Sequence, residues 1–176
     1  MTRPAADMSD ALAPDANRSS TRTRPEPGDC FTADVAMRWG DMDAQAHLNN
    51  AVYFRLMEEA RIQMMHRSGV PYPPDRAIVL AHASCDFLRP VVYPAVVRIV
   101  QRVVRIGRSS AELELTLGDA NHPETPLYAR ARNVLVWMDL KAGTSAAWAP
   151  EILSGLAQHL RRPDEPAALD SPQRTL

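Results

Sequence analysis

A short polar stretch, Arg38–Tyr53, holds most of the side chains in this sequence that could perform chemistry. Its reactive members, in chain order, are Asp41, Asp43, Gln45, His47, Asn49 and Asn50. The stretch lies between a strand-like segment and a helix-like segment, so its polar groups would stand beside a helix N-terminus. Backbone N–H groups at a helix start can polarise an acyl oxygen. The stretch therefore predicts a site that acts on a carbonyl compound.

The flanking segments predict how this stretch is held. Apolar and polar residues alternate over 31–39, which is typical of a half-buried strand. Asn49 or Asn50 is a suitable N-cap, and the sequence 68–71, Ser-Gly-Val-Pro, predicts a helix end. The apolar stripe of this helix is formed by Tyr53, Met57, Ala60 and Met64. A helix of about four to five turns would place Asp43 in a tight turn just before its start.

The run from Asp43 to Tyr53 resembles the catalytic motif of hotdog-fold thioesterases, the 4-hydroxybenzoyl-CoA thioesterase-like family. In that family a D-x-D pair precedes a long central helix, and its second acid acts at the thioester carbonyl. The resemblance covers about residues 30–160. It implies that Asp43 is the catalytic nucleophile or general base and that the backbone N–H of Asn50 polarises the carbonyl. Asp41 would hold the turn together.

The same run is also similar to the D-x-N-x-H segment of plant acyl carrier protein thioesterases. There Asp, Asn and His act together, and Gln45 stands in place of the Asn. The similarity gives His47 a role in orienting Asp43, in proton transfer or in contacting the acyl group. The alternative is an ordinary turn histidine. Ala46 occupies a position where many bacterial members carry Gly.

A second polar turn, Gly107–Ser110, separates two strand-like segments. Gly and Ser favour a hairpin turn for backbone reasons alone. The family resemblance adds a function, because a basic, Ser-bearing turn at this place grips the phosphates of coenzyme A. Arg108 and Ser109 are the predicted contacts, with Arg102 and Arg105 adding charge.

Glu58 is a further candidate, because its place on the predicted helix could border the acyl pocket. A salt bridge to Arg55 or Arg61 is the alternative.

Composition excludes several function classes. The 176 residues are 45 % hydrophobic and 23 % charged, with a net charge of −1, which fits one domain with a real core. No basic stripe predicts nucleic-acid binding, and no apolar run is long enough for a membrane span. Cys30 and Cys85 form no metal-binding pattern. We expect a cytoplasmic protein without a metal or cofactor, coenzyme A being part of the substrate.

The remaining segments predict an α+β domain at 29–162 between a disordered segment at 1–28 and a flexible tail at 163–176. A mitochondrial presequence is the alternative for the N-terminal segment, and its acids and prolines oppose it. The predicted later elements are strands at 78–88, 95–106, 111–117 and 127–138 and a helix at 151–161. The resemblance implies the hotdog fold, one long central helix wrapped by an antiparallel sheet of about five strands.

These observations favour a thioesterase acting on acyl-CoA or acyl-ACP. A hotdog dehydratase would need a His with Glu or Asp on the central helix, and 53–65 contains no His. A non-catalytic acyl-CoA-binding module is the other alternative. We also expect a homodimer or homotetramer with sites shared between subunits, because edges of β-branched strands such as 95–106 invite pairing.

Overall fold

The computed structural model describes residues 22–69 and 73–162. Its elements, in chain order, are β1 (Cys30–Ala36), the short 3-10 helix η1 (Trp39–Asp41), α1 (Asn50–Arg67), β2 (Arg76–Phe87), β3 (Val96–Ile106), β4 (Ser110–Asp119), β5 (Ala129–Asp139), β6 (Thr144–Ser145) and α2 (Pro150–His159). Most of the predicted 1–28 segment, Pro71 and the predicted tail from 163 lie outside the described residues.

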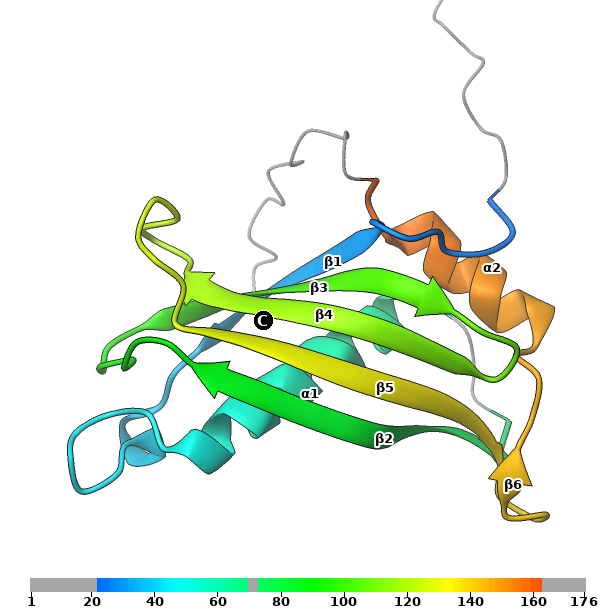
Figure 1. Cartoon of the computed structure of the whole chain (residues 1–176), viewed down its shortest axis with the longest axis horizontal. Helices are drawn as coiled ribbons and strands as arrows, with labels where there is room; N and C mark the ends of the chain where they lie inside the picture. The colour runs from blue at the N-terminus through cyan, green and yellow to red at the C-terminus, as the bar shows by residue number, and fades with distance from the viewer. Residues whose placement is uncertain (1–21, 70–72, 163–176) are drawn as a thin grey trace, which may run out of the picture.

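The strands form one antiparallel sheet in the order β1-β3-β4-β5-β2, and β6 pairs with the end of β5. Helix α1 crosses one face of this sheet, and α2 lies near the start of β1 (Figure 1). The predicted α+β architecture, with one long helix against an antiparallel sheet of about five strands, is confirmed.

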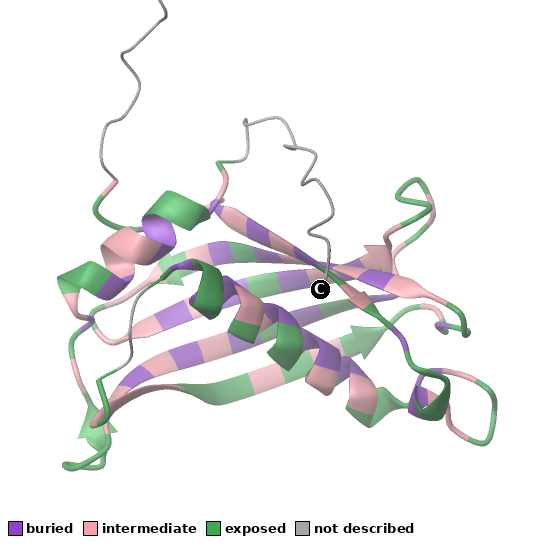
Figure 2. Cartoon of the chain, turned by 180° about the vertical axis from the view of Figure 1, so that it is seen from behind, coloured by how far each residue is buried: buried purple, intermediate pink, exposed green. Residues whose placement is uncertain are grey.

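The core lies between α1 and the inner face of the sheet, where buried and more exposed residues alternate along β3, β4 and β5 (Figure 2). The predicted stripe of α1 is confirmed, since Tyr53, Met57, Ala60 and Met64 are all buried. Burying a large apolar side chain stabilises a fold by roughly 1.5–3 kcal/mol. Burial of this stripe fixes the position of α1, and with it the position of the residues at both helix ends.

Two predictions about strands are wrong. The first strand ends at Ala36 and does not reach Trp39, which lies in η1 with 73 % of its surface exposed. The chain turns here because the Asp41 carboxylate accepts a hydrogen bond from the Arg38 N–H. The segment 95–106 is not a sheet edge, since β3 is paired on both sides, with β1 and β4.

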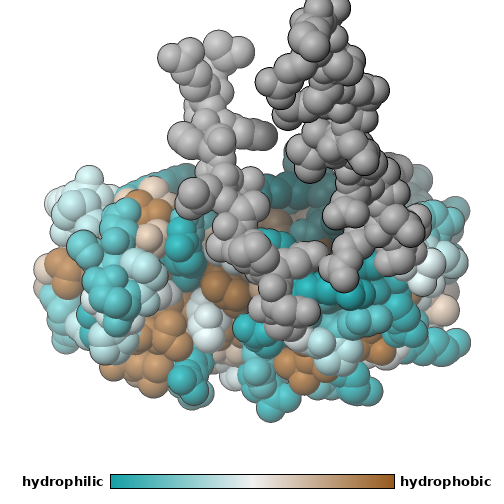
Figure 3. Space-filling model, turned by 90° about the horizontal axis from the view of Figure 1, so that it is seen from above, coloured by the Kyte–Doolittle hydropathy of each residue, from teal (hydrophilic) through white to brown (hydrophobic). Residues whose placement is uncertain are grey.

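The two edges of the sheet are β1 and β2, and they differ in cover. The start of β1 is paired, because Cys30 and Arg161 exchange two backbone hydrogen bonds of 2.8 and 2.9 Å. The surface on the β1 side is seen from above in Figure 3. Outside the atoms drawn in grey, its apolar side chains form small patches among hydrophilic ones. By contrast, β2 is longer, pairs only with β5 among the described strands, and is exposed along most of its length (Figure 2). An open edge of this kind invites pairing with another strand.

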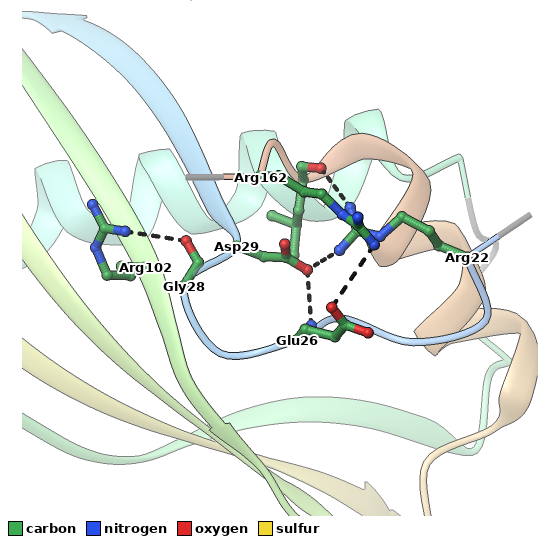
Figure 4. A network of polar contacts seen from close by, with 7 residues as sticks. Arg22, Glu26, Gly28, Asp29, Arg102 and Arg162 are labelled. Atoms are coloured by element: carbon green, nitrogen blue, oxygen red, sulfur yellow. Dashed lines mark hydrogen bonds and ion pairs between the residues drawn. The ribbon is translucent and has the colours of Figure 1, made fainter. Parts of the chain in front are cut away.

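A polar network joins the segment before β1 to the segment after α2 (Figure 4). Asp29 is 1 % exposed; its Oδ2 forms an ion pair with Arg22 and accepts a hydrogen bond from the Glu26 N–H at 2.8 Å. Arg22 also donates to the Leu160 carbonyl oxygen at 3.1 Å. Residues 22–28, assigned from sequence to the disordered segment, thus contact the domain directly.

This network generates a prediction for stability. We expect Asp29→Asn to lower the free energy of unfolding by roughly 2 kcal/mol, because it leaves a largely buried guanidinium without its counter-charge. Asp34→Asn is the matched control, since Asp34 pairs with Arg98 in an exposed ion pair that should contribute less than about 1 kcal/mol. Urea unfolding measures both. Equal losses in the two variants would contradict a special role for the buried pair.

Candidate active site

The predicted turn that carries Asp43 is a closed loop between η1 and α1. Met42 and Leu48 pair across its base as an antiparallel bridge. Above them the Asp43 N–H donates to the His47 carbonyl oxygen at 2.8 Å, and the Ala46 N–H donates to the Asp43 carbonyl oxygen at 3.0 Å. Ala46 adopts φ 60°, a left-handed conformation that glycine adopts at less cost. The loop thus accommodates Ala at a position where many bacterial members carry Gly.

The Asp43 carboxylate is held by the backbone of its own loop. Its Oδ1 accepts hydrogen bonds from the N–H groups of Gln45 at 2.8 Å and His47 at 3.3 Å. No described residue donates a hydrogen bond to its Oδ2, and the side chain is partly exposed. One oxygen therefore fixes the orientation of the carboxylate while the other is available to water or substrate.

Asp41 has a different environment from Asp43. It is 8 % exposed, its Oδ2 accepts from the Arg38 N–H at 2.8 Å, and its Oδ1 lies 2.7 Å from Nη2 of Arg55 on α1. One oxygen thus holds the start of η1 and the other ties the turn to α1, which agrees with the structural role expected for Asp41.

The start of α1 lies directly beside this loop. Asn49 is the N-cap, and its side chain accepts from the Ala51 N–H at 2.9 Å. The Asn49 N–H donates to the Asp41 carbonyl oxygen at 3.0 Å, which brings the first helical residue next to the two acids. The Asn50 N–H has no hydrogen-bond acceptor in the described part of the chain. The free donor expected at the helix start is therefore the Asn50 amide.

A buried anchor, which the sequence did not reveal, fixes the far side of the loop. Leu48 is 2 % exposed, and its N–H donates to the carbonyl oxygen of the fully buried Val91 at 2.9 Å. Just upstream of Val91, Arg89 lies over the Tyr128 ring and donates to the Pro126 carbonyl oxygen at 2.7 Å. The segment after β2 thus supports the loop from behind. In the sequence, the one hint of this anchor is that Leu48 is an apolar residue between polar neighbours.

Gln45 and His47 support Asp43 through their backbones. The Gln45 side chain is exposed and that of His47 is half-buried. The structure gives neither side chain a hydrogen bond to Asp43, so the orienting contact expected of His47 comes from its amide N–H. The roles of both side chains toward a substrate stay predictions.

The Arg108 turn is a β3–β4 hairpin, as its residue types predict. The Ser109 carbonyl oxygen accepts from the Trp137 N–H at 2.8 Å, and the Arg108 carbonyl oxygen accepts from the Trp148 N–H at 2.9 Å. The Arg108 side chain is exposed at the tip. Of the two arginines expected to add charge, Arg105 is paired with Glu112 at 2.5 Å and Arg102 donates to the Gly28 carbonyl oxygen at 3.1 Å.

The structure does not bring the two predicted groups together within one chain. The Asp43 loop follows the end of β1, where Ala36 pairs with Val96 at the start of β3. Arg108 follows Ile106, at the opposite end of the same 11-residue strand. At about 3.3 Å per residue the two ends of β3 are roughly 33 Å apart. Figure 1 shows the loop and the hairpin at opposite ends of the sheet.

Glu58 lies on the solvent side of α1 and forms an ion pair of 3.7 Å with Arg61, one of the two partners considered from sequence. Phe54 and Ile62, one helical turn before and after it, are 39 % and 55 % exposed. The role of Glu58 toward a substrate stays a prediction.

The two cysteines are free thiols. Burial, reinforced by the nearby charge of Asp86, raises the pKa of the Cys85 thiol to about 11. Cys85 is therefore protonated at neutral pH, and a thiolate nucleophile at this position is disfavoured.

Known proteins share this architecture. Residues 37–156 match the family model of the thioesterase-like superfamily. The PA2801 protein from Pseudomonas aeruginosa, a proposed thioesterase, superposes with a TM-score of 0.66 and 31 % identity, covering 72 % of this chain and 97 % of that one. A proposed acyl-CoA thioesterase from Xanthomonas campestris gives 0.58 and 32 %, covering 63 % and 94 %. The uncharacterised YsmA protein of Bacillus subtilis is 29 % identical over 122 residues, 69 % of this chain and 81 % of YsmA.

The chain therefore belongs to the thioesterase-like superfamily, and its single long helix on an antiparallel sheet is the hotdog fold. Membership supports thioester hydrolysis as the general activity. Among the described residues, no helix is long and apolar enough to cross a membrane.

Proposed function

We propose that this protein hydrolyses acyl-CoA or acyl-ACP thioesters with Asp43 as the catalytic carboxylate. The main support is that two groups lie on neighbouring segments: the Asp43 carboxylate, which has one oxygen without a hydrogen bond from the described residues, and the Asn50 N–H at the start of α1, which has no acceptor there. Thioesters suit such a site, because their carbonyl carbon is more electrophilic than that of an oxygen ester.

Two routes fit this arrangement. As a general base, Asp43 takes a proton from water, whose oxygen adds to the thioester carbonyl carbon. As a nucleophile, its free oxygen adds directly and forms a mixed anhydride that water then hydrolyses. In both routes the Asn50 N–H stabilises the oxyanion, an effect worth about 3 kcal/mol for one such donor. In both routes the tetrahedral intermediate collapses by breaking the C–S bond, and the expelled thiolate gains a proton. This step gives the free acid in the first route and the mixed anhydride in the second, before water attacks that anhydride.

The dehydratase alternative finds no support in α1. A hotdog dehydratase would need a His paired with an acid along the helix, and the one His in α1 is the exposed His66 in its last turn. A non-catalytic acyl-CoA-binding module would share the fold but would not need the free carboxylate oxygen.

The most direct test of the catalytic role is Asp43→Asn. The amide keeps the size of the side chain but removes the base, so we expect hydrolysis to fall at least about 100-fold with unchanged thermal stability. Asp41→Asn is the comparison, because it weakens the ion pair with Arg55 and should lower stability more than Asp43→Asn does. Free thiol release across an acyl-CoA panel measures activity. An Asp43→Asn enzyme with a third of wild-type turnover would remove Asp43 from the mechanism.

Arg108 and Ser109 are proposed to bind the phosphates of coenzyme A. The support is the exposure of the Arg108 side chain at the hairpin tip, where its guanidinium can meet a phosphate. We expect Arg108→Ala to raise KM for acyl-CoA with kcat nearly unchanged, which is typical of lost uniform binding. The effect should shrink with acyl-pantetheine, which lacks the nucleotide phosphates. An equal rise in KM for both substrates would assign the hairpin a structural role.

We also propose that two copies pair through β2. This strand is the long open edge of the sheet, and Val79 and Leu80 on it are exposed apolar residues. Because β2 runs from the hairpin end of the sheet to the Asp43 end, antiparallel pairing about a two-fold axis places the Asp43 loop of one copy beside the opposite end of the other. The proposed pairing would bring the Asp43 loop of one copy next to the Arg108 hairpin of the other.

A charge at the β2 edge should break this assembly. We expect sedimentation at micromolar concentration to show a dimer or tetramer for the wild type and a monomer with little activity for Leu80→Glu. Leu140→Glu, at another exposed apolar residue just after β5, is the control and should leave both properties unchanged. An active wild-type monomer would contradict the shared site.

A further inference from the structure

A cavity of about 420 Å³ lies between the second half of α1 and the first half of β2. Its volume is within the range of small-molecule pockets. Ile62, Met65 and Ile78 form much of its apolar wall. It lies at the end of β2 away from the Asp43 loop of the same chain, which is the end that antiparallel β2 pairing would bring next to the Asp43 loop of a second copy.

The charges around this cavity are unbalanced. Arg61, His66 and Arg76 line it, and no acid is found among its described lining residues. Arg76 is already engaged, with Nη1 2.6 Å from Oδ2 of Asp139. Arg61 is therefore the arginine of this cavity that has no described carboxylate within hydrogen-bond distance.

The Arg61 side chain is mostly buried and has no ion-pair partner within hydrogen-bond distance among the described residues. Its side chain is 11 % exposed, and its ion pair with Glu58 spans 3.7 Å, beyond hydrogen-bond distance. Glu58 itself is 62 % exposed and largely solvated. Burial lowers the pKa of Arg61, which reflects the cost of holding this cation away from water. A guanidinium in an apolar wall gains most from a carboxylate, because two parallel N–H···O bonds can form.

We propose that this cavity receives the acyl group of the substrate and that Arg61 selects acyl chains ending in a carboxylate, the half-thioesters of dicarboxylic acids. The inference rests on the proposed hydrolase function and on the proposed pairing through β2, and it names the substrate class. The apolar wall contacts the methylene chain, Arg61 binds the terminal carboxylate, and the thioester carbonyl faces the Asp43 loop of the second copy.

Matched pairs of substrates test the proposal. We expect the wild type to hydrolyse adipyl-CoA with a kcat/KM at least about tenfold above that of hexanoyl-CoA, the scale of a charge-assisted hydrogen bond. Arg61→Met should remove this preference by lowering kcat/KM for adipyl-CoA while leaving hexanoyl-CoA within about twofold. Arg132→Met, on the exposed outer side of β5, is the control and should keep the preference.

A second variant keeps the test informative if Arg61→Met does not fold. Ile62 is 55 % exposed, so Ile62→Trp should fold and narrow the cavity. It should reduce turnover of adipyl-CoA much more than that of acetyl-CoA. Equal reductions would show that the acyl chain does not enter the cavity.

The other outcomes separate the two proposals. Hydrolysis of acyl-CoAs without a preference for the carboxylate would overturn this inference and leave the hydrolase function standing. Equal losses on both substrates in Arg61→Met, or dissociation of the oligomer, would make Arg61 a structural or interface residue. A wild type that hydrolyses no thioester would overturn the hydrolase function itself.

Discussion

Burial of one face of α1 against the inner face of the sheet is the constraint on which the rest of this structure depends. Leu56, Met57 and Ala60 are almost completely buried there, and they set the axis of the helix. Because the axis is fixed, the N-terminal amides of α1 meet the Asp43 loop at one end. Its C-terminal half forms the cavity with β2 at the other. The same packing turns Phe54 and Glu58 toward solvent.

Much of this structure could be predicted from the sequence, because it depends on contacts between residues that are close in the chain. The 3.6-residue stripe of α1, the Asn49 cap and the Gly69 end, with φ 62°, each depend on neighbours within a few residues, and all three are found in the structure. The closed loop at Asp43 was also readable, because its hydrogen bonds join residues at most four positions apart. The structural role of Asp41 was expected from its place in the D-x-D pair, and its contact with Arg55 gives that role a physical basis.

What the sequence could not reveal depends on contacts between distant segments. Strand order is one case, because a β-branched strand such as β3 looks the same at an edge and in the middle of a sheet. The support of Leu48 by Val91 and the ion pair of Arg22 with Asp29 near Leu160 also join parts of the chain that lack any shared pattern. The separation of Asp43 from Arg108 is the most consequential case. It follows from the length of β3.

The central claim is that one chain carries both halves of a site and that each complete site needs two chains. Mixing Asp43→Asn with the cavity-narrowed Ile62→Trp, after dissociation and reassembly, tests it with a long-chain acyl-CoA. Each mixed dimer then has one site with an intact Asp43 loop facing an intact cavity, so the account predicts activity well above that of either variant alone. A mixture no more active than the mean of the two variants would show that Asp43 and the cavity act within the same chain, which would contradict the account.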